Sequence, residues 1–174
     1  KIELDGYKTD VVTRKEFPMS RARDALRGKR IAVLGYGVQG PAQSMNMKDN
    51  GFDVIIGQDP KDRVYWDKAQ GDGWIPGKTL FPMEEAAAMG DVIKYLISDA
   101  GQKICWPRIK PYLTKGKTLY FSHGFSITYN HLTGVVPPED IDVILVAPKG
   151  PGALVRIDFL KKKGYNIIEI NGEQ

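Results

Sequence analysis

The chain has 174 residues, of which 42% are hydrophobic and 26% charged, and it carries a formal net charge of +4. This length suffices for one domain with a sizeable core but is short for two, and the composition is typical of soluble globular proteins. No stretch approaches the roughly 20 consecutive apolar residues of a membrane span, and the polar N-terminus lacks the apolar region of a signal peptide. We therefore expect no membrane partner.

The basic residues are spread along the chain and are not interleaved with aromatic residues in one patch, which argues against a nucleic-acid partner. Two explanations of the mild basicity stay open: a lysine-rich solvated surface, or attraction of an anionic ligand such as a phosphate-bearing cofactor. The tight run Lys161–Lys163 is expected at the exposed end of a helix. The single cysteine, Cys105, excludes an intramolecular disulfide, and its apolar surroundings favour a buried thiol over a nucleophile.

Residues 1–28 are expected to form an N-terminal arm and helix, with residues 1–12 extended and a helix over Thr13–Leu26 that Gly28 ends. Residues 29–174 are expected to form one dinucleotide-binding domain, in which short apolar runs alternate with helical segments. The predicted strands are Ile31–Leu34, Val54–Ile56, Val92–Ile97, Thr118–Ser122, Val143–Ala147 and Ile167–Ile170, and the predicted helices are Gln39–Asp49, Met83–Met89, Gln102–Tyr112 and Gly152–Lys163.

Several of the apolar runs are continuous, as is typical of strands that are buried on both faces. The alternation of strands and helices predicts an α/β fold with a doubly wound, mainly parallel sheet of the Rossmann type. The segment Gln58–Leu80 is the least regular part, because it is rich in glycine and proline, and a short helix around Tyr65–Gln70 is possible there.

The predicted strand Ile31–Leu34 leads into a G-x-G-x-x-G turn and then a helix. In such a turn Gly35 permits the tight bend, Gly37 lets the backbone approach a pyrophosphate, and Gly40 lets helix and strand pack closely. The helix N-terminus adds free N–H groups and a positive dipole end. The flanking strand and helix make a dinucleotide site the favoured interpretation, and a glycine-rich turn without a ligand is the alternative.

Asp59 follows the second strand, at a position where an acid can accept a hydrogen bond from the ribose 2′-OH of NAD. The alternative is a turn-initiating aspartate before Pro60. Lys61 and Arg63 lie close by and could instead accept the 2′-phosphate of NADP. Because an anionic Asp59 would repel that phosphate, we expect NAD(H) to be favoured over NADP(H).

Three motifs occur in order along the chain: Gly35–Gly40, Ser122-His-Gly-Phe125 and Ala147-Pro-Lys-Gly-Pro-Gly152. Together with Val136-Pro-Pro138 they resemble ketol-acid reductoisomerase, an oxidoreductase family of branched-chain amino-acid synthesis, over almost the whole chain. That resemblance implies a Mg²⁺-dependent isomerisation of 2-acetolactate or 2-aceto-2-hydroxybutyrate, followed by reduction with a nicotinamide cofactor. It also implies a cytoplasmic protein in bacteria and an organellar one in plants or fungi.

The resemblance extends to individual positions. It implies catalytic roles for His123, which matches the active-site histidine of the family, and for Lys149, which matches a lysine near substrate and metals. From the residues alone, both follow strand ends, where ligands of open α/β sheets bind, but a turn histidine and an ordinary loop lysine are the alternatives. The cofactor contacts that the resemblance implies are Tyr36, Gly37, Val38, Gln39, Asp99, Ala100, Gly101, Gln102 and Gly152. Asp59 lies where family members often place an arginine that binds the 2′-phosphate, and this departure supports NAD(H).

In this family, carboxylates of a helical C-terminal domain hold the two magnesium ions, and the sequence has no counterpart of that domain. The remaining acidic residues, for example Glu84, Glu85, Glu139 and Asp140, form no convincing cluster, so we expect no metal site here. The leading hypothesis is therefore the cofactor domain of such an enzyme, inactive alone. One alternative is a stand-alone NAD(P)-binding or redox-sensing module. Another is a different type of dehydrogenase, but such an enzyme would not explain the motifs at Ser122–Phe125 and Ala147–Gly152.

Overall fold

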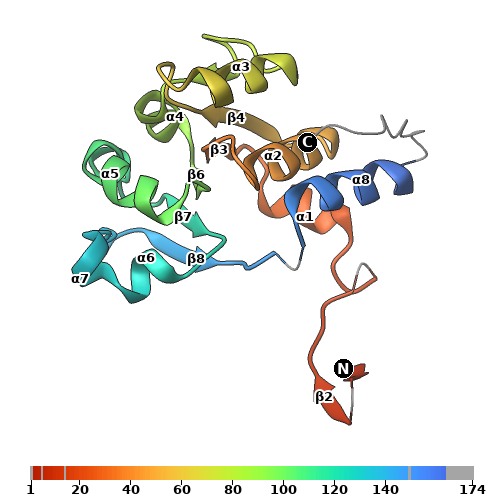
Figure 1. Cartoon of the computed structure of the whole chain (residues 1–174). Helices are drawn as coiled ribbons and strands as arrows, with labels where there is room; N and C mark the ends of the chain where they lie inside the picture. The colour runs from red at the N-terminus through yellow and green to blue at the C-terminus, as the bar shows by residue number, and fades with distance from the viewer. Residues whose placement is uncertain (1, 5, 14, 149, 164–174) are drawn as a thin grey trace.

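The computed structural model describes residues 2–4, 6–13, 15–148 and 150–163, and its centre is a parallel β-sheet (Figure 1). In that part of the chain the sheet has six strands in the spatial order β5-β4-β3-β6-β7-β8, and every neighbouring pair is parallel. The strands are β3 (Arg30–Leu34), β4 (Asp53–Gly57), β5 (Leu80–Phe81), β6 (Val92–Tyr95), β7 (Thr118–Phe121) and β8 (Asp142–Leu145).

The order of the strands reverses at β3. The chain first adds β4 and β5 on one side of β3 and then returns to add β6, β7 and β8 on the other side. This topology confirms the doubly wound parallel sheet that the sequence predicts. It also creates a topological switch point between β3 and β6, and ligands of open α/β sheets bind at such a point, outside the carboxyl ends of the strands.

The continuous apolar run of β3 is buried on both faces of the sheet, as expected. Ile31 and Val33 belong to one hydrophobic cluster, whereas Ala32 and Leu34 belong to another on the opposite face. The alternation follows from the period of two residues along a strand. Neighbouring strands continue each cluster, since Ile31 pairs with Val54 of β4 and with Val92 of β6.

Helices cover both faces (Figure 1). The helices α4 (Met83–Met89) and α5 (Asp99–Ile109) contribute side chains to the cluster that contains Leu34, whereas α2 (Gly40–Asp49) and α3 (Arg63–Gly71) contribute to the other cluster. On the side of α2, α8 (Gly152–Lys162) packs against that helix. On the side of α5 lie the turn η1 (Lys110–Tyr112) and the short helices α6 (Phe125–Thr128) and α7 (Asn130–Thr133). Among the described residues, no helix has the length and apolar character needed to cross a membrane.

The N-terminal arm differs from the prediction. Its extended part forms an antiparallel pair, β1 (Ile2–Leu4) and β2 (Tyr7–Thr9), which projects away from the sheet in Figure 1. The helix predicted over residues 13–26 is only α1 (Met19–Ala25). The physical reason is Pro18, because a proline disfavours helical geometry in the residue before it, so the segment that precedes it stays outside the helix.

Strand β8 also differs from the prediction, since all of its residues are exposed. Val143 and Leu145 lie on the face shared with Leu119 and Phe121, and 43% and 56% of their surfaces are accessible to solvent. The expectation of a strand buried on both faces is therefore wrong for β8. The predicted strand Ile167–Ile170 lies outside the described residues.

Candidate nucleotide-binding site

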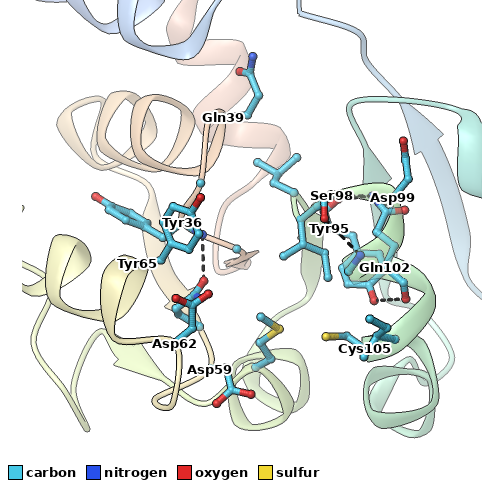
Figure 2. Close-up of a pocket in the computed structure, with 18 of the residues that line it drawn as sticks. Tyr36, Gln39, Asp59, Asp62, Tyr65, Tyr95, Ser98, Asp99, Gln102 and Cys105 are labelled. Atoms are coloured by element: carbon cyan, nitrogen blue, oxygen red, sulfur yellow. Dashed lines mark hydrogen bonds between the residues drawn. The ribbon is translucent and has the colours of Figure 1, made fainter. Parts of the chain in front are cut away.

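A cavity of about 760 Å³ opens at the carboxyl ends of β3, β4 and β6, at the switch point of the sheet. Its walls come from the glycine turn after β3, from the segment after β4, from the segment after β6 and from α5. Figure 2 shows Tyr65 and Asp59 on one side of the cavity and Gln102 and Cys105 on the other. The volume is in the range of small-molecule and cofactor sites.

The three glycines of the turn have the geometry that their expected roles require. Gly35 has a φ of +99°, which L side chains rarely adopt. A Cβ atom on Gly40 would lie 2.1 Å from the carbonyl oxygen of Gly35, so close packing of α2 on the turn requires glycine there. A Cβ atom on Gly37 would meet no atom within 4 Å, so the backbone at Gly37 borders open space. This space and the N-terminus of α2 at Gly40 fit a pyrophosphate.

Tyr36, one of the predicted contact residues, anchors the turn from within the protein. Its side chain is fully buried, and its hydroxyl donates a hydrogen bond to Asp72 (2.9 Å) and accepts one from the Trp74 indole N–H (2.8 Å). Its backbone N–H donates to the Gln58 side-chain oxygen at 3.1 Å. Burial, followed by the hydrogen bond to Asp72, raises the pKa of Tyr36. Tyr36 therefore holds the shape of the turn, with three partners that the sequence analysis did not identify.

Asp59 lies at the cavity wall, just after β4. Its Oδ1 accepts the Lys61 backbone N–H at 2.9 Å, and its Oδ2 lies 3.3 Å from Nη1 of Arg108. The hydrogen bond from Lys61, and then the Arg108 guanidinium, hold the pKa of the Asp59 carboxyl below its usual value. Asp59 thus makes the turn hydrogen bond of an aspartate before proline and also presents an ionised carboxylate to the cavity.

Lys61 and Arg63, the two cations near Asp59 that could accept a 2′-phosphate, lie in different surroundings. Lys61 lines the cavity, whereas Arg63 pairs with Asp67 on α3 at 2.8 Å and does not line it. The arginine that reaches Asp59 is Arg108 of α5, whose Nε donates to Glu84 of α4. Sequence reasoning missed Arg108, because no motif surrounds it and only the fold brings it to β4.

The predicted contact segment Asp99–Gln102 is the first turn of α5, which begins three residues before the helix predicted from Gln102. Its N-cap is Ser98, whose hydroxyl accepts the Gly101 N–H at 3.2 Å. Asp99, Gly101 and Gln102 line the cavity, whereas Ala100 is exposed and does not.

Gln102 is 3% exposed and its amide nitrogen donates to the Ile97 carbonyl at 3.1 Å. Its buried Oε1 atom has no hydrogen-bond partner within the described residues. A buried acceptor without a partner is costly, so this atom at the cavity wall fits a donor group of a bound ligand. The glycine turn, the Asp59 carboxylate and Gln102 together fit a nicotinamide dinucleotide.

The structure brings one of the two predicted catalytic residues to the cavity. His123 follows β7 at the rim, where its Nδ1 accepts the Phe125 N–H at 3.3 Å and lies 3.7 Å from Oδ1 of Asp99. Lys149 lies outside the described residues. Gly152 begins α8, and a Cβ atom there would lie 2.2 Å from the Val38 carbonyl oxygen. Gly152 therefore supports the back of the glycine turn and does not line the cavity.

The remaining members of the turn, Val38 and Gln39, line the cavity. The Gln39 amide nitrogen also donates to the Gly150 carbonyl at 3.3 Å, which ties the turn to the segment before α8. Among the described residues, no group of three or more His, Cys, Asp or Glu side chains could hold a metal ion. The described residues thus fit a dinucleotide but not a magnesium centre.

Comparison with known proteins agrees with this geometry. The family model described as "Acetohydroxy acid isomeroreductase, NADPH-binding domain" matches residues 25–172. The ketol-acid reductoisomerase (NAD(+)) of Desulfosudis oleivorans is 58% identical over 165 residues, which are 95% of this chain and 47% of that protein. The ketol-acid reductoisomerase (NADP(+)) of Methanococcus maripaludis is 49% identical over 145 residues, which are 83% of this chain and 41% of that protein.

Among solved structures, an NADH-preferring ketol-acid reductoisomerase from an uncultured archaeon superposes with a TM-score of 0.77 at 40% sequence identity. The match covers 88% of this chain and 45% of that one. The chain therefore spans less than half the length of the relatives that it matches.

Proposed function

Because this chain belongs to the acetohydroxy acid isomeroreductase family, as its nicotinamide-binding domain, we propose that it supplies the cofactor half of a ketol-acid reductoisomerase. The observation that carries the proposal is the meeting of the glycine turn, Asp59 and His123 around one cavity at the switch point. A reduced nicotinamide bound there would supply a hydride for the reduction of a keto acid.

We further propose that the cavity prefers NAD(H) to NADP(H). Asp59 is ionised and has lone pairs beyond the two that Lys61 and Arg108 use, so it can accept hydrogen bonds from the ribose hydroxyls. The same charge repels a 2′-phosphate. The (NAD(+)) designation of the Desulfosudis relative and the NADH preference of the archaeal structure support this choice, whereas the Methanococcus relative is designated (NADP(+)).

We propose that His123 and Lys149 serve the substrate end of the site, and that the magnesium ligands belong to a part of the enzyme that this chain does not contain. His123 can orient a substrate or relay a proton, since it stands exposed at the rim beside Asp99. Mg²⁺ needs several converging oxygen ligands, and the described residues offer no such group. The chain alone should therefore bind cofactor without completing the reaction.

A titration of the 174-residue chain with NADH and NADPH tests the proposal. We expect tighter binding of NADH. Gly37→Ala should weaken both nucleotides at least about tenfold without changing the melting temperature, because its methyl group enters the space next to the backbone that approaches the pyrophosphate. Gly71→Ala, on α3, is the matched control, because its Cβ also meets no atom within 4 Å but lies outside the cavity wall.

Binding of neither nucleotide, or tighter binding of NADPH, would contradict the proposal. A second assay mixes the chain with Mg²⁺, NADH and 2-acetolactate. We expect no oxidation of NADH, and turnover by this chain alone would show that its residues suffice for the metal-dependent step.

A further inference from the structure

Arg108 lines the cavity and connects two carboxylates: Asp59 after β4, which also lines the cavity, and Glu84 at the start of α4, which does not. We propose that Arg108 is a second determinant of cofactor choice: it positions the Asp59 carboxylate for the ribose, while Asp59 and Glu84 together withhold its guanidinium from a 2′-phosphate. This inference rests on the NAD(H) preference proposed above and adds a residue far from Asp59 in the sequence.

The geometry leaves Arg108 accessible to a ligand. Its side chain is 45% exposed, whereas Asp59 and Glu84 are 28% and 25% exposed. The guanidinium uses Nη1 toward Asp59 and Nε toward Glu84, so three of its five N–H donors remain. A planar group with several donors suits phosphate better than an ammonium does. If Asp59 loses its charge, the freed Nη1 and its neighbour Nη2 can therefore both be offered to a phosphate.

The local charge explains why the native arrangement rejects a phosphate. Asp59, Arg108 and Glu84 together carry one net negative charge. The other acidic and basic side chains that line the cavity, apart from His123, are Lys61, Asp62 and Asp99, which add one more acidic than basic group. A 2′-phosphate, which carries close to two negative charges, would enter this field unfavourably. Replacing Asp59 by asparagine removes the repulsion of the phosphate and also one of the two ion pairs of Arg108, so that only the pair with Glu84 remains.

Four proteins test the proposal: the wild type, Asp59→Asn, Arg108→Gln and the double variant, each titrated with NADH and NADPH at one ionic strength. We expect Asp59→Asn to tighten NADPH binding about tenfold or more, the gain that one charge-assisted hydrogen bond gives. In the Arg108→Gln background the same substitution should tighten NADPH binding at least about threefold less than it does when Arg108 is present, because only the lost repulsion by Asp59 remains. Glu84→Gln added to Asp59→Asn should tighten NADPH binding further.

Arg63→Gln is the matched control, because it removes an arginine near Asp59 that does not line the cavity. It should leave the effect of Asp59→Asn on NADPH unchanged. Melting temperatures measured on the same proteins show whether Arg108 has only a structural role. In that case loss of the Arg108–Glu84 pair between α5 and α4 would lower the melting temperature, and the effect of Asp59→Asn on the NADPH Kd would not depend on Arg108.

The inference would be overturned if Asp59→Asn lowered the NADPH Kd equally with and without Arg108. It would also be overturned if Arg63→Gln changed the effect of Asp59→Asn on the NADPH Kd. These outcomes leave the proposed function intact if the wild type still prefers NADH. By contrast, a wild type that binds neither nucleotide, or that prefers NADPH, contradicts the proposed function itself.

Discussion

Lys94 lies in β6, in the middle of the sheet, with its ammonium 3.9 Å from the centre of the Tyr120 ring on β7. Burial lowers the pKa of Lys94 to about 8, because water solvates the charged form better than the sheet does. The contact with the aromatic ring offsets part of this cost. A charged side chain inside a parallel sheet thus makes the stability of the domain depend on pH.

We predict that Lys94→Met removes a rise in stability between about pH 8 and the pKa of about 10.4 of an unfolded lysine. In this window the native wild type has released the proton and the unfolded chain still binds it, so the free energy of unfolding increases with pH, by up to ~3 kcal/mol. Below pH 8 the native state bears the full cost of the buried charge. Urea unfolding at pH 7 and pH 10 measures the effect. The exposed Lys103→Met is the control, and equal pH slopes for wild type and Lys94→Met would refute the prediction.

The site residues that belong to local sequence motifs could be predicted, whereas those that reach the site from distant segments could not. The glycine turn and Asp59 can be predicted from the local sequence, because tight turns and strand ends restrict which residue types fit. The partners Asp72 and Trp74 of Tyr36, and Arg108 beside Asp59, come from distant segments. Their contacts depend on the three-dimensional packing of α3, α5 and the sheet, which no local pattern encodes.

At the scale of elements, α8 holds the glycine turn in place from behind. Gly152 at its start packs against the Val38 carbonyl, and Arg156 pairs with Asp49 at the end of α2 at 2.7 Å. Two contacts thus fix α8 along α2, one near each end of α2. The position of the glycine turn therefore depends on the packing of α8 against α2 as well as on the glycines of the turn.

We predict that Gly152→Ala lowers both the stability and the nucleotide affinity of the chain. The added Cβ would lie 2.2 Å from a backbone oxygen that cannot rotate away, and such overpacking costs about 1–3 kcal/mol. For a chain of this size that corresponds to a melting temperature lower by roughly 2–4 °C for each kcal/mol. Because Val38 belongs to the turn, the NADH Kd should rise as well.

Gly150→Ala is the control for that measurement, since its Cβ would make only an ordinary contact, at 3.6 Å, with Val155. If the two variants give the same melting temperature and the same NADH Kd, α8 does not support the turn in this way.

Several helices were predicted close to their observed bounds. The helix α4 has the predicted bounds, and α3 extends the short helix expected in the glycine-rich segment. The short elements β5, α6 and α7 were missed, because two to four residues carry too little periodicity. For β8 the apolar pattern indicates a strand whose side chains should be buried, but it does not show whether residues of the same chain or of another chain bury them.

At the scale of the molecule, β8 is an edge strand of the sheet among the described residues, and its apolar side chains are exposed. An edge strand of this kind offers unpaired backbone groups and apolar side chains to any other chain. We predict that the isolated chain associates with itself through β8, and that Leu145→Lys weakens this association at least about tenfold. The folding stability should change by less than about 0.5 kcal/mol, since the side chain is 56% exposed.

Sedimentation velocity over a range of concentrations measures the association. Val64→Lys on α3 is the control, because its side chain is 74% exposed on an element that packs at the opposite edge of the sheet. Association that responds equally to both variants, or a wild type that stays monomeric at every concentration, would show that β8 is not the contact.

The reversal of strand order at β3 has a consequence for how the protein is made. β3 pairs with β4, which follows shortly after it, but its other neighbour is β6, and the register joins Leu34 to Tyr95. A ribosome therefore releases β3, β4 and β5 while the backbone N–H and C=O groups on one edge of β3 are still unpaired, until the chain has been synthesised past Tyr95. During that interval the cavity lacks the wall that β6, the segment after it and α5 supply, so the complete cofactor site forms only after this second half of the sheet has been added.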